Sequence, residues 1–189
     1  MKRRWIGFSV ISLFVLAAGL ALASEKETYA ERYTAFGTNQ QRGKTGTIQI
    51  AIQRWSTPEE RQMLVDTLQK QGREALAAAL AKMPVIGWIR LANTRSQDLR
   101  YAFQTPLPDG GRRVVIGTDR VVNYLEGTTA SRTQHYQFSV AEIHFDKDGR
   151  GEGKLSPLAK VDIEKGTNQI EVEDYTSQPV RLLQVKVVK

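Results

Sequence analysis

The chain of 189 residues contains no cysteine and only 2 histidines. Without cysteine there is no disulfide framework, no zinc ribbon, no iron–sulfur cluster, no thiol nucleophile and no cysteine-linked lipid anchor. The sequence also lacks the patterns of a P-loop, a dinucleotide-binding turn, a G-x-S-x-G elbow and an H-E-x-x-H zinc site. The fold must therefore be stabilised by core packing and backbone hydrogen bonds alone.

A large excess of charge is also absent once the N-terminal segment is set aside. The whole chain has 27 basic and 20 acidic residues and a formal net charge of +7. Three of the basic residues, Lys2, Arg3 and Arg4, lie in the segment 1–23, which has no acid, so the segment 24–189 carries a net charge of +4. This balance is typical of an ordinary protein surface, and we expect no nucleic-acid partner.

The segment 1–23 has the composition of an export signal. Three basic residues precede an apolar run from Trp5 to Leu20, and Ala21-Leu-Ala23 supplies the small-x-small pattern for cleavage before Ser24. The alternative is an uncleaved anchor, because the apolar run approaches the roughly 20 residues that span a bilayer. We therefore expect an exported protein, periplasmic or secreted, that meets a membrane only through this segment if it is retained.

A change in composition sets the expected domain boundaries. Residues 24–43 are polar and predict a loosely ordered lead-in. Residues 44–189 predict a single α+β domain, because a chain of this length suits one core and the sequence shows no repeat and no linker.

One stretch predicts helix. Thr57-Pro-Glu-Glu60 is a capping box with proline at the first helical position, and apolar side chains follow at helical spacing as far as Pro84. Glycine inside a helix costs about 1 kcal/mol relative to alanine, so Gly72 predicts a break between two helices that form a hairpin.

Strands are expected in most of the remaining chain. Ile48, Ile50 and Ile52 alternate with polar or small residues, which is the period-2 pattern of a half-buried strand. Further candidates follow through short turns without intervening helices, which predicts antiparallel sheet. We therefore expect an α+β fold in which a helical hairpin packs on a twisted antiparallel sheet, with a partial β-barrel as the alternative. These candidates span residues 85–91, 99–104, 112–118, 121–126, 134–145, 153–164, 169–175 and 180–188.

Aromatic side chains occur along these predicted strands, Trp88, Tyr101, Phe138 and Phe145 among them. Core packing is the usual role of strand aromatics, and we expect it here. The alternative is that aromatics interleaved with arginine stack on bases or sugars.

The acidic turn Asp146-Lys-Asp148-Gly-Arg150 resembles a calcium loop only superficially. A calcium loop of the EF-hand type needs an oxygen donor where this sequence has Arg150. A glycine-rich hairpin between two strands explains the same residues, so we expect no metal and no cofactor.

Four arginines form the candidate anion-binding site, namely Arg112, Arg113, Arg120 and Arg132. Arginine binds carboxylate and phosphate groups with two parallel N–H donors, which suits an anionic ligand. The alternative, which we favour, is structural ion pairing with nearby carboxylates such as Asp119.

The candidates for catalysis are Asp119, Glu142 and His144. Glu142 and His144 are two residues apart on a predicted strand, so they share a face and could support acid–base chemistry. His135 falls on the opposite face, and no nucleophile stands at a recognisable spacing. We therefore predict no catalytic residue; an enzyme would require these groups to converge in a concave pocket.

The order of several motifs resembles an uncharacterised family of exported bacterial proteins. The resemblance covers most of residues 57–183 and implies a single compact unit, with no activity, cofactor or site residue to transfer. Its pieces are the helical segment 58–83, GRRVVIGTDR at 111–120, YQF at 136–138, DGRGEGKL at 148–155 and QPVRL at 178–182.

These observations favour an exported cell-envelope protein that acts as a non-catalytic binding or accessory domain. Its partner, a small ligand or another envelope protein, is not specified by the sequence. The alternatives are a periplasmic hydrolase that uses Asp119, Glu142 or His144, and assembly with partner proteins through an exposed sheet edge.

Overall fold

The computed structural model describes residues 28–39, 43–120, 122, 138–156, 160–163, 170–173 and 180–188. The predicted export signal, Arg132, His135 and most of the predicted strand 121–126 lie outside the described residues. Among the described residues, no helix combines the length and the apolar composition that crossing a membrane requires.

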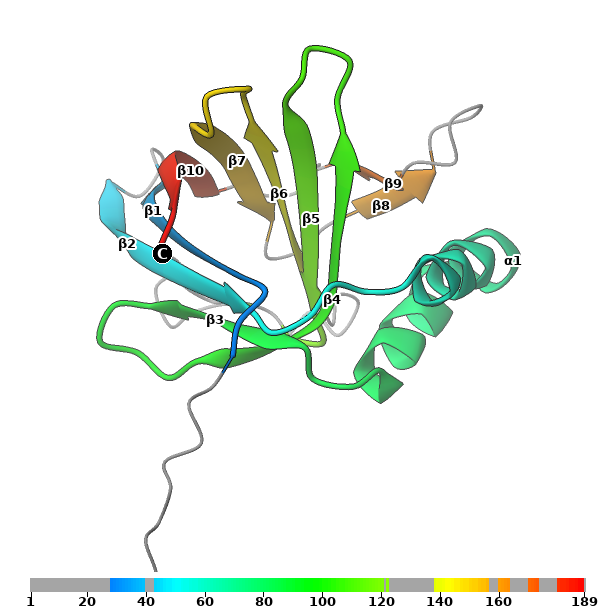
Figure 1. The fold of residues 1–189 in the computed structure, drawn as a ribbon. Helices are drawn as coiled ribbons and strands as arrows, with labels where there is room; N and C mark the ends of the chain where they lie inside the picture. Colours follow the sequence, from blue (N-terminus) through cyan, green and yellow to red (C-terminus); the bar gives the residue numbers. More distant parts are fainter. Residues whose placement is uncertain are drawn as a thin grey trace, which may run out of the picture.

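Most of the described chain is β-structure (Figure 1). Within the described residues a single helix, α1 (Pro58–Lys82), follows the second strand, and a separate two-stranded antiparallel sheet is formed by β8 (Lys160–Ile163) and β9 (Ile170–Glu173). The other eight strands form a closed antiparallel barrel in the order β1-β10-β7-β6-β5-β4-β3-β2. Their bounds are β1 (Glu31–Asn39), β2 (Lys44–Ile52), β3 (Gly87–Leu91), β4 (Gln97–Pro106), β5 (Arg112–Thr118), β6 (Ser139–Phe145), β7 (Gly151–Ser156) and β10 (Val180–Val187).

The predicted α+β fold, a helical hairpin on an open or partly curled sheet, is wrong, because the main sheet closes completely. The strand that closes it, β1, lies in the segment that we expected to be a loosely ordered lead-in. β1 pairs with β2 from Glu31↔Ile52 to Asn39↔Lys44, and with β10 through pairs such as Tyr33↔Val187. Closure leaves the barrel without a free edge, so assembly through such an edge is not available to it.

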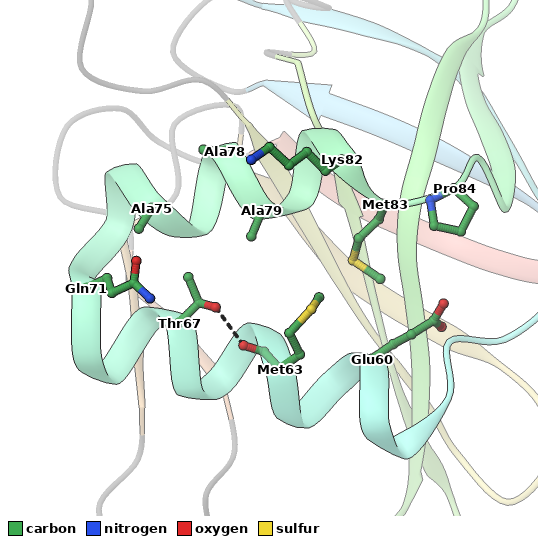
Figure 2. Close-up of a pocket in the computed structure, with 10 residues that line it drawn as sticks. All are labelled: Glu60, Met63, Thr67, Gln71, Ala75, Ala78, Ala79, Lys82, Met83 and Pro84. Carbon is green, nitrogen blue, oxygen red and sulfur yellow. Dashed lines mark hydrogen bonds between the residues drawn. The ribbon is translucent and has the colours of Figure 1, made fainter.

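Helix α1 begins as its sequence predicts. The Thr57 hydroxyl accepts a hydrogen bond from the Glu60 amide at 3.2 Å, and the Glu60 carboxylate accepts one from the Thr57 amide at 2.9 Å. At Gly72 the backbone has φ 81° and ψ −173°, a conformation that glycine alone adopts readily. The chain direction reverses there, so Figure 2 shows two arms of α1 lying side by side.

The barrel interior is a packed hydrophobic core to which all eight strands contribute. Ile50, Ile52, Leu99, Val114 and Ile143 are each at most 1% exposed. A second apolar cluster joins α1 to the outer face of β4, β5 and β6, and includes Leu64, Leu68, Leu76, Leu80, Tyr101, Phe138 and Val140. Helix α1 therefore covers the outer face of the barrel at β4, β5 and β6.

Candidate functional site

Arg112 lies at one end of the barrel and points inward, like Val114 and Ile116 on the same strand. Its guanidinium forms two hydrogen bonds with the Glu31 carboxylate, one to Oε2 at 2.8 Å and a shorter one to Oε1. It also donates to Gln104 Oε1 at 2.8 Å and stacks 4.8 Å from the centre of the Phe145 ring. Arg112 therefore closes the end of the core through an ion pair with Glu31.

Tyr33 completes this cluster by donating its hydroxyl proton to Glu31 Oε2 at 2.8 Å. Burial raises the pKa of Tyr33 well above its usual value, and the neighbouring Glu31 carboxylate adds to the increase. The Tyr33 hydroxyl therefore stays protonated and serves as a donor.

Arg113, the next residue, points to the outer face of the barrel. Its guanidinium binds Glu142 in bidentate fashion, from Nε to Oε1 at 2.8 Å and from Nη2 to Oε2 at 3.0 Å. His144 Nε2 lies 2.6 Å from the same Oε1. The structure thus brings Glu142 and His144 together, with both carboxylate oxygens already engaged.

The environment of Glu142 favours its ionised form. Burial alone would raise the pKa of Glu142, but the hydrogen bonds from Arg113 and His144 outweigh it and hold the pKa below its usual value. A carboxylate that is held ionised by a bidentate arginine is a poor proton acceptor at neutral pH. This arrangement is that of a structural ion pair.

Asp119 is separated from Glu142 and His144. It follows the end of β5, four residues beyond Val115, which pairs with Glu142, so the separation along the sheet is about 13 Å. Asp119 Oδ2 accepts a hydrogen bond from Arg100 Nε at 3.2 Å. Arg100 also donates to the carbonyl of Met83 at the end of α1 at 2.9 Å, so it fastens the helix to the barrel.

The structure does not gather the predicted anion site in one place. Arg112 points into the barrel and Arg113 out of it, Arg120 is exposed at the far end of β5, and Arg132 lies outside the described residues. The first two serve the ion pairs with Glu31 and Glu142. The alternative of structural ion pairing therefore accounts for both of these arginines.

The turn between β6 and β7 is the glycine-rich hairpin that the sequence favours. The Asp146 carboxylate accepts hydrogen bonds from the amides of Asp148 at 2.9 Å and Arg150 at 2.8 Å, and Gly149 has φ 78°. Asp146 therefore stabilises the turn through the backbone. Across the described ranges, no group of three or more His, Asp or Glu side chains is placed to hold a metal ion.

A groove of about 560 Å³ lies between the two arms of α1 (Figure 2). Met63, 46% exposed, and the buried Met83 supply apolar surface from the two arms, and Thr67 uses its hydroxyl to donate to the Met63 carbonyl at 2.7 Å. The sequence predicted the break at Gly72 but not the groove, which depends on how the side chains of the two arms lie against each other. The groove is lined by Glu60, Met63, Thr67, Gln71, Ala75, Ala78, Ala79, Lys82, Met83 and Pro84.

Comparison with known proteins gives no match to a family model, to a curated protein or to a solved structure. The resemblance to a family of exported bacterial proteins therefore stays a prediction.

Replacing Glu142 with glutamine should remove an acid-dependent part of the stability. The folded pKa of Glu142 lies below its usual value, so its contribution is complete above about pH 4.5 and is lost as the pH falls through the folded pKa. We expect Glu142→Gln to lower the free energy of unfolding by about 2 kcal/mol at neutral pH, and by less as the pH falls. Urea unfolding between about pH 3 and pH 7 measures both effects.

The matched control is Glu152→Gln, which removes an exposed carboxylate from β7 that forms no ion pair among the described residues. This variant should follow the wild-type pH profile. Parallel profiles for Glu142→Gln and the wild type would contradict a native-state ion pair.

Proposed function

We propose that the chain is an exported cell-envelope protein that acts by binding, and that the groove between the arms of α1 holds its ligand. The observation that carries the proposal is the groove itself, whose volume of about 560 Å³ is in the range of small-molecule sites. The barrel interior is packed with apolar side chains from all eight strands. Export is supported by the composition of residues 1–23.

The lining of the groove suits a small apolar molecule with an anionic end. Met63 and Met83 have flexible, polarisable side chains that adapt to ligands of different shape, and the alanines of the second arm leave room beside them. Lys82 lines the same groove and has no ion pair among the described residues. The Glu60 carboxylate is held by Arg54 through hydrogen bonds of 2.8 and 2.9 Å. Lys82 is therefore the cation that can meet an anionic group.

A hydrolase that uses Asp119, Glu142 or His144 has less support. Both oxygens of Glu142 are engaged by Arg113 and His144, and Asp119 lies at the other end of β5. None of the three lines the groove.

Filling the groove should weaken the binding of an apolar anion. Anilinonaphthalene sulfonate is a suitable probe, because its fluorescence rises when it leaves water. Ala78→Trp places a large ring in the groove, and we expect it to weaken probe binding at least about tenfold, the effect of losing one well-buried apolar group.

The matched control is Ala81→Trp, the same substitution at an exposed position of the same arm that does not line the groove. This variant should bind the probe like the wild type. Equal binding by the wild type and both variants would contradict the assignment of the site.

A natural ligand and the export step can be tested on the same sample. Native mass spectrometry of protein purified from its own host should show a chain whose first residue is Ser24, together with the mass of a bound small molecule. The full-length mass would contradict cleavage, and an Ala78→Trp sample carrying the same ligand would contradict the groove as its site.

A further inference from the structure

The outer faces of four neighbouring strands, β3, β2, β1 and β10, form one continuous surface on the side of the barrel away from α1 (Figure 1). We call this surface the basic face, after its four cations. One row of paired residues carries Lys186 on β10 and Arg90 on β3, joined through Thr34 and Gln49. Arg32 lies in an adjacent row and Arg181 towards the other end of β10. All four cations are exposed.

The basic face has no opposing charge of its own. The four strands contain a single acid, Glu31, which points into the barrel end and pairs with Arg112. On the remaining strands of the barrel the arginines are paired, Arg100 with Asp119, Arg112 with Glu31 and Arg113 with Glu142. Lys154 on β7 is exposed and forms no ion pair within the described residues. Within the described ranges, none of the four cations of the basic face forms an ion pair. The four cations therefore give the basic face a positive potential that no carboxylate of its own strands offsets.

The acidic side chain of Asp98 lies at the border of this surface. Asp98 on β4 lies opposite Trp88, and its carboxylate is 3.6 Å from Arg100. The net charge of +4 expected for the exported chain therefore does not show how its charges are distributed, with four cations on the basic face and Asp98 at its border.

Aromatic rings accompany the cations. Trp88 donates its indole N–H to the Tyr29 hydroxyl at 3.1 Å, and the two rings pack edge to face with centres 6.3 Å apart. Arg90 lies 4.8 Å from the Trp88 ring centre, and Arg32 lies 5.6 Å from that of Tyr29. Phe36 adds an apolar ring that is 44% exposed. Tryptophan, tyrosine and arginine are the residues that concentrate at the boundary between a bilayer and water.

The basic face is also where the described chain begins. Tyr29 belongs to it, and the apolar run from Trp5 to Leu20 ends eight residues before Thr28. Eight residues span at most about 28 Å, which is the greatest distance between Thr28 and a bilayer that holds this run.

We propose that the basic face binds the anionic phospholipid surface of a membrane, through contacts of Arg32, Arg90, Arg181 and Lys186 with lipid phosphates. Trp88 and Phe36 lie among these cations, at the depth of the headgroups. A single-stranded nucleic acid fits less well, because base stacking needs an open ring face and Arg90 covers one face of Trp88. The contact is independent of the groove in α1 and would hold the exported domain at the membrane after cleavage.

The test is vesicle co-sedimentation of the chain from Ser24 to Lys189, which contains every described residue of both core clusters. We expect binding to vesicles of equal parts phosphatidylcholine and phosphatidylglycerol, weak binding to phosphatidylcholine alone, and loss of binding as salt is raised. A cation at such a surface contributes about fivefold, so the double variant Arg181→Gln/Lys186→Gln should bind about 30-fold more weakly.

The matched control is Lys147→Gln/Arg150→Gln, which makes the same charge change at the exposed turn between β6 and β7. It should bind within about twofold of the wild type, and thermal unfolding should show that both double variants remain folded. Equal losses in the two double variants, or no preference for phosphatidylglycerol, would overturn the proposal. Tighter binding to a single-stranded oligonucleotide than to the vesicles, with the same dependence on Arg181 and Lys186, would assign the face to nucleic acid and overturn it too.

Discussion

A chain that begins at residue 40 is expected not to fold, whereas one that begins at Ser24 should fold like the full chain. The difference is β1, which pairs along its whole length with β2 and, on its other side, with β10. It also places Tyr33, 1% exposed, and Ala35, 3% exposed, in the barrel core. Its removal exposes the edges of both neighbouring strands and the core between them to water. We expect the free-energy cost of this exposure to exceed the roughly 5 to 15 kcal/mol that stabilises a domain.

Circular dichroism and thermal unfolding would measure this effect. The chain from Ser24 should unfold in one cooperative transition, and the chain from residue 40 should show none. A synthetic peptide of residues 28–39 should restore the transition when it is added to the shorter chain, because it supplies the missing strand. A cooperative transition at the wild-type midpoint in the shorter chain alone would show that β1 does not close the barrel.

The same strand explains why the fold class could not be predicted. The inward positions of β1 hold Tyr33, Ala35, Gly37 and Asn39, whose composition differs from the Ile48-Ile50-Ile52 pattern that identified β2. Its closing contact, Tyr33↔Val187, joins residues from opposite ends of the chain. Local patterns predicted the bounds of β5 correctly, but they do not indicate which distant strands pair with each other. An open sheet and a closed barrel therefore give the same local sequence pattern.

The alternation of side chains along a strand explains why two arginines of the predicted anion-binding site, Arg112 and Arg113, do not lie together. Arg112 and Arg113 are neighbours on β5, and adjacent residues of a strand point to opposite faces. The two side chains therefore bind Glu31 inside the barrel and Glu142 outside it. What the sequence could not give was the distance between Asp119 and Glu142, because that depends on the register of β5 against β6.

The aromatic residues were predicted in part. Tyr101, Phe138 and Phe145 are core residues as expected, each at most 5% exposed. Trp88 lies on the outer face of β3 instead, against Tyr29 and beneath Arg90. Its position follows from the alternation Trp88-Ile89-Arg90, in which Ile89, 2% exposed, is the residue that faces the core.

Two glycine-to-alanine substitutions should change stability in opposite directions. At Gly87 an added Cβ would lie 2.1 Å from the carbonyl oxygen of Ala51 on the neighbouring strand β2. Neither backbone can move away without breaking the pairing Ile52↔Gly87 at this edge of the core. We expect Gly87→Ala to lower the free energy of unfolding by about 3 to 5 kcal/mol, as for severe overpacking combined with lost backbone hydrogen bonds.

Gly117 is the matched control, because it is also a buried strand glycine. An added Cβ would lie 3.5 Å from Tyr101 Cβ and 3.7 Å from Leu80 Cδ2, which are ordinary contacts, and a cavity of about 30 Å³ adjoins it between α1 and β5. Alanine also restricts the unfolded chain, so Gly117→Ala should raise the free energy of unfolding by about 0.5 to 1 kcal/mol. Urea unfolding at one pH compares the two variants with the wild type.

The opposite signs expected for the stability changes of Gly87→Ala and Gly117→Ala test the packing around each glycine, and not a general effect of replacing glycine. Both substitutions add the same methyl group and remove the same backbone freedom from the unfolded state. Only the distance to the nearest atoms, a carbonyl oxygen at Gly87 and two side-chain carbons at Gly117, separates them. A Gly87→Ala variant within about 1 kcal/mol of the wild type would mean that β2 and β3 do not pair in this register, and the surface that carries Arg90 and Trp88 would then need a different arrangement.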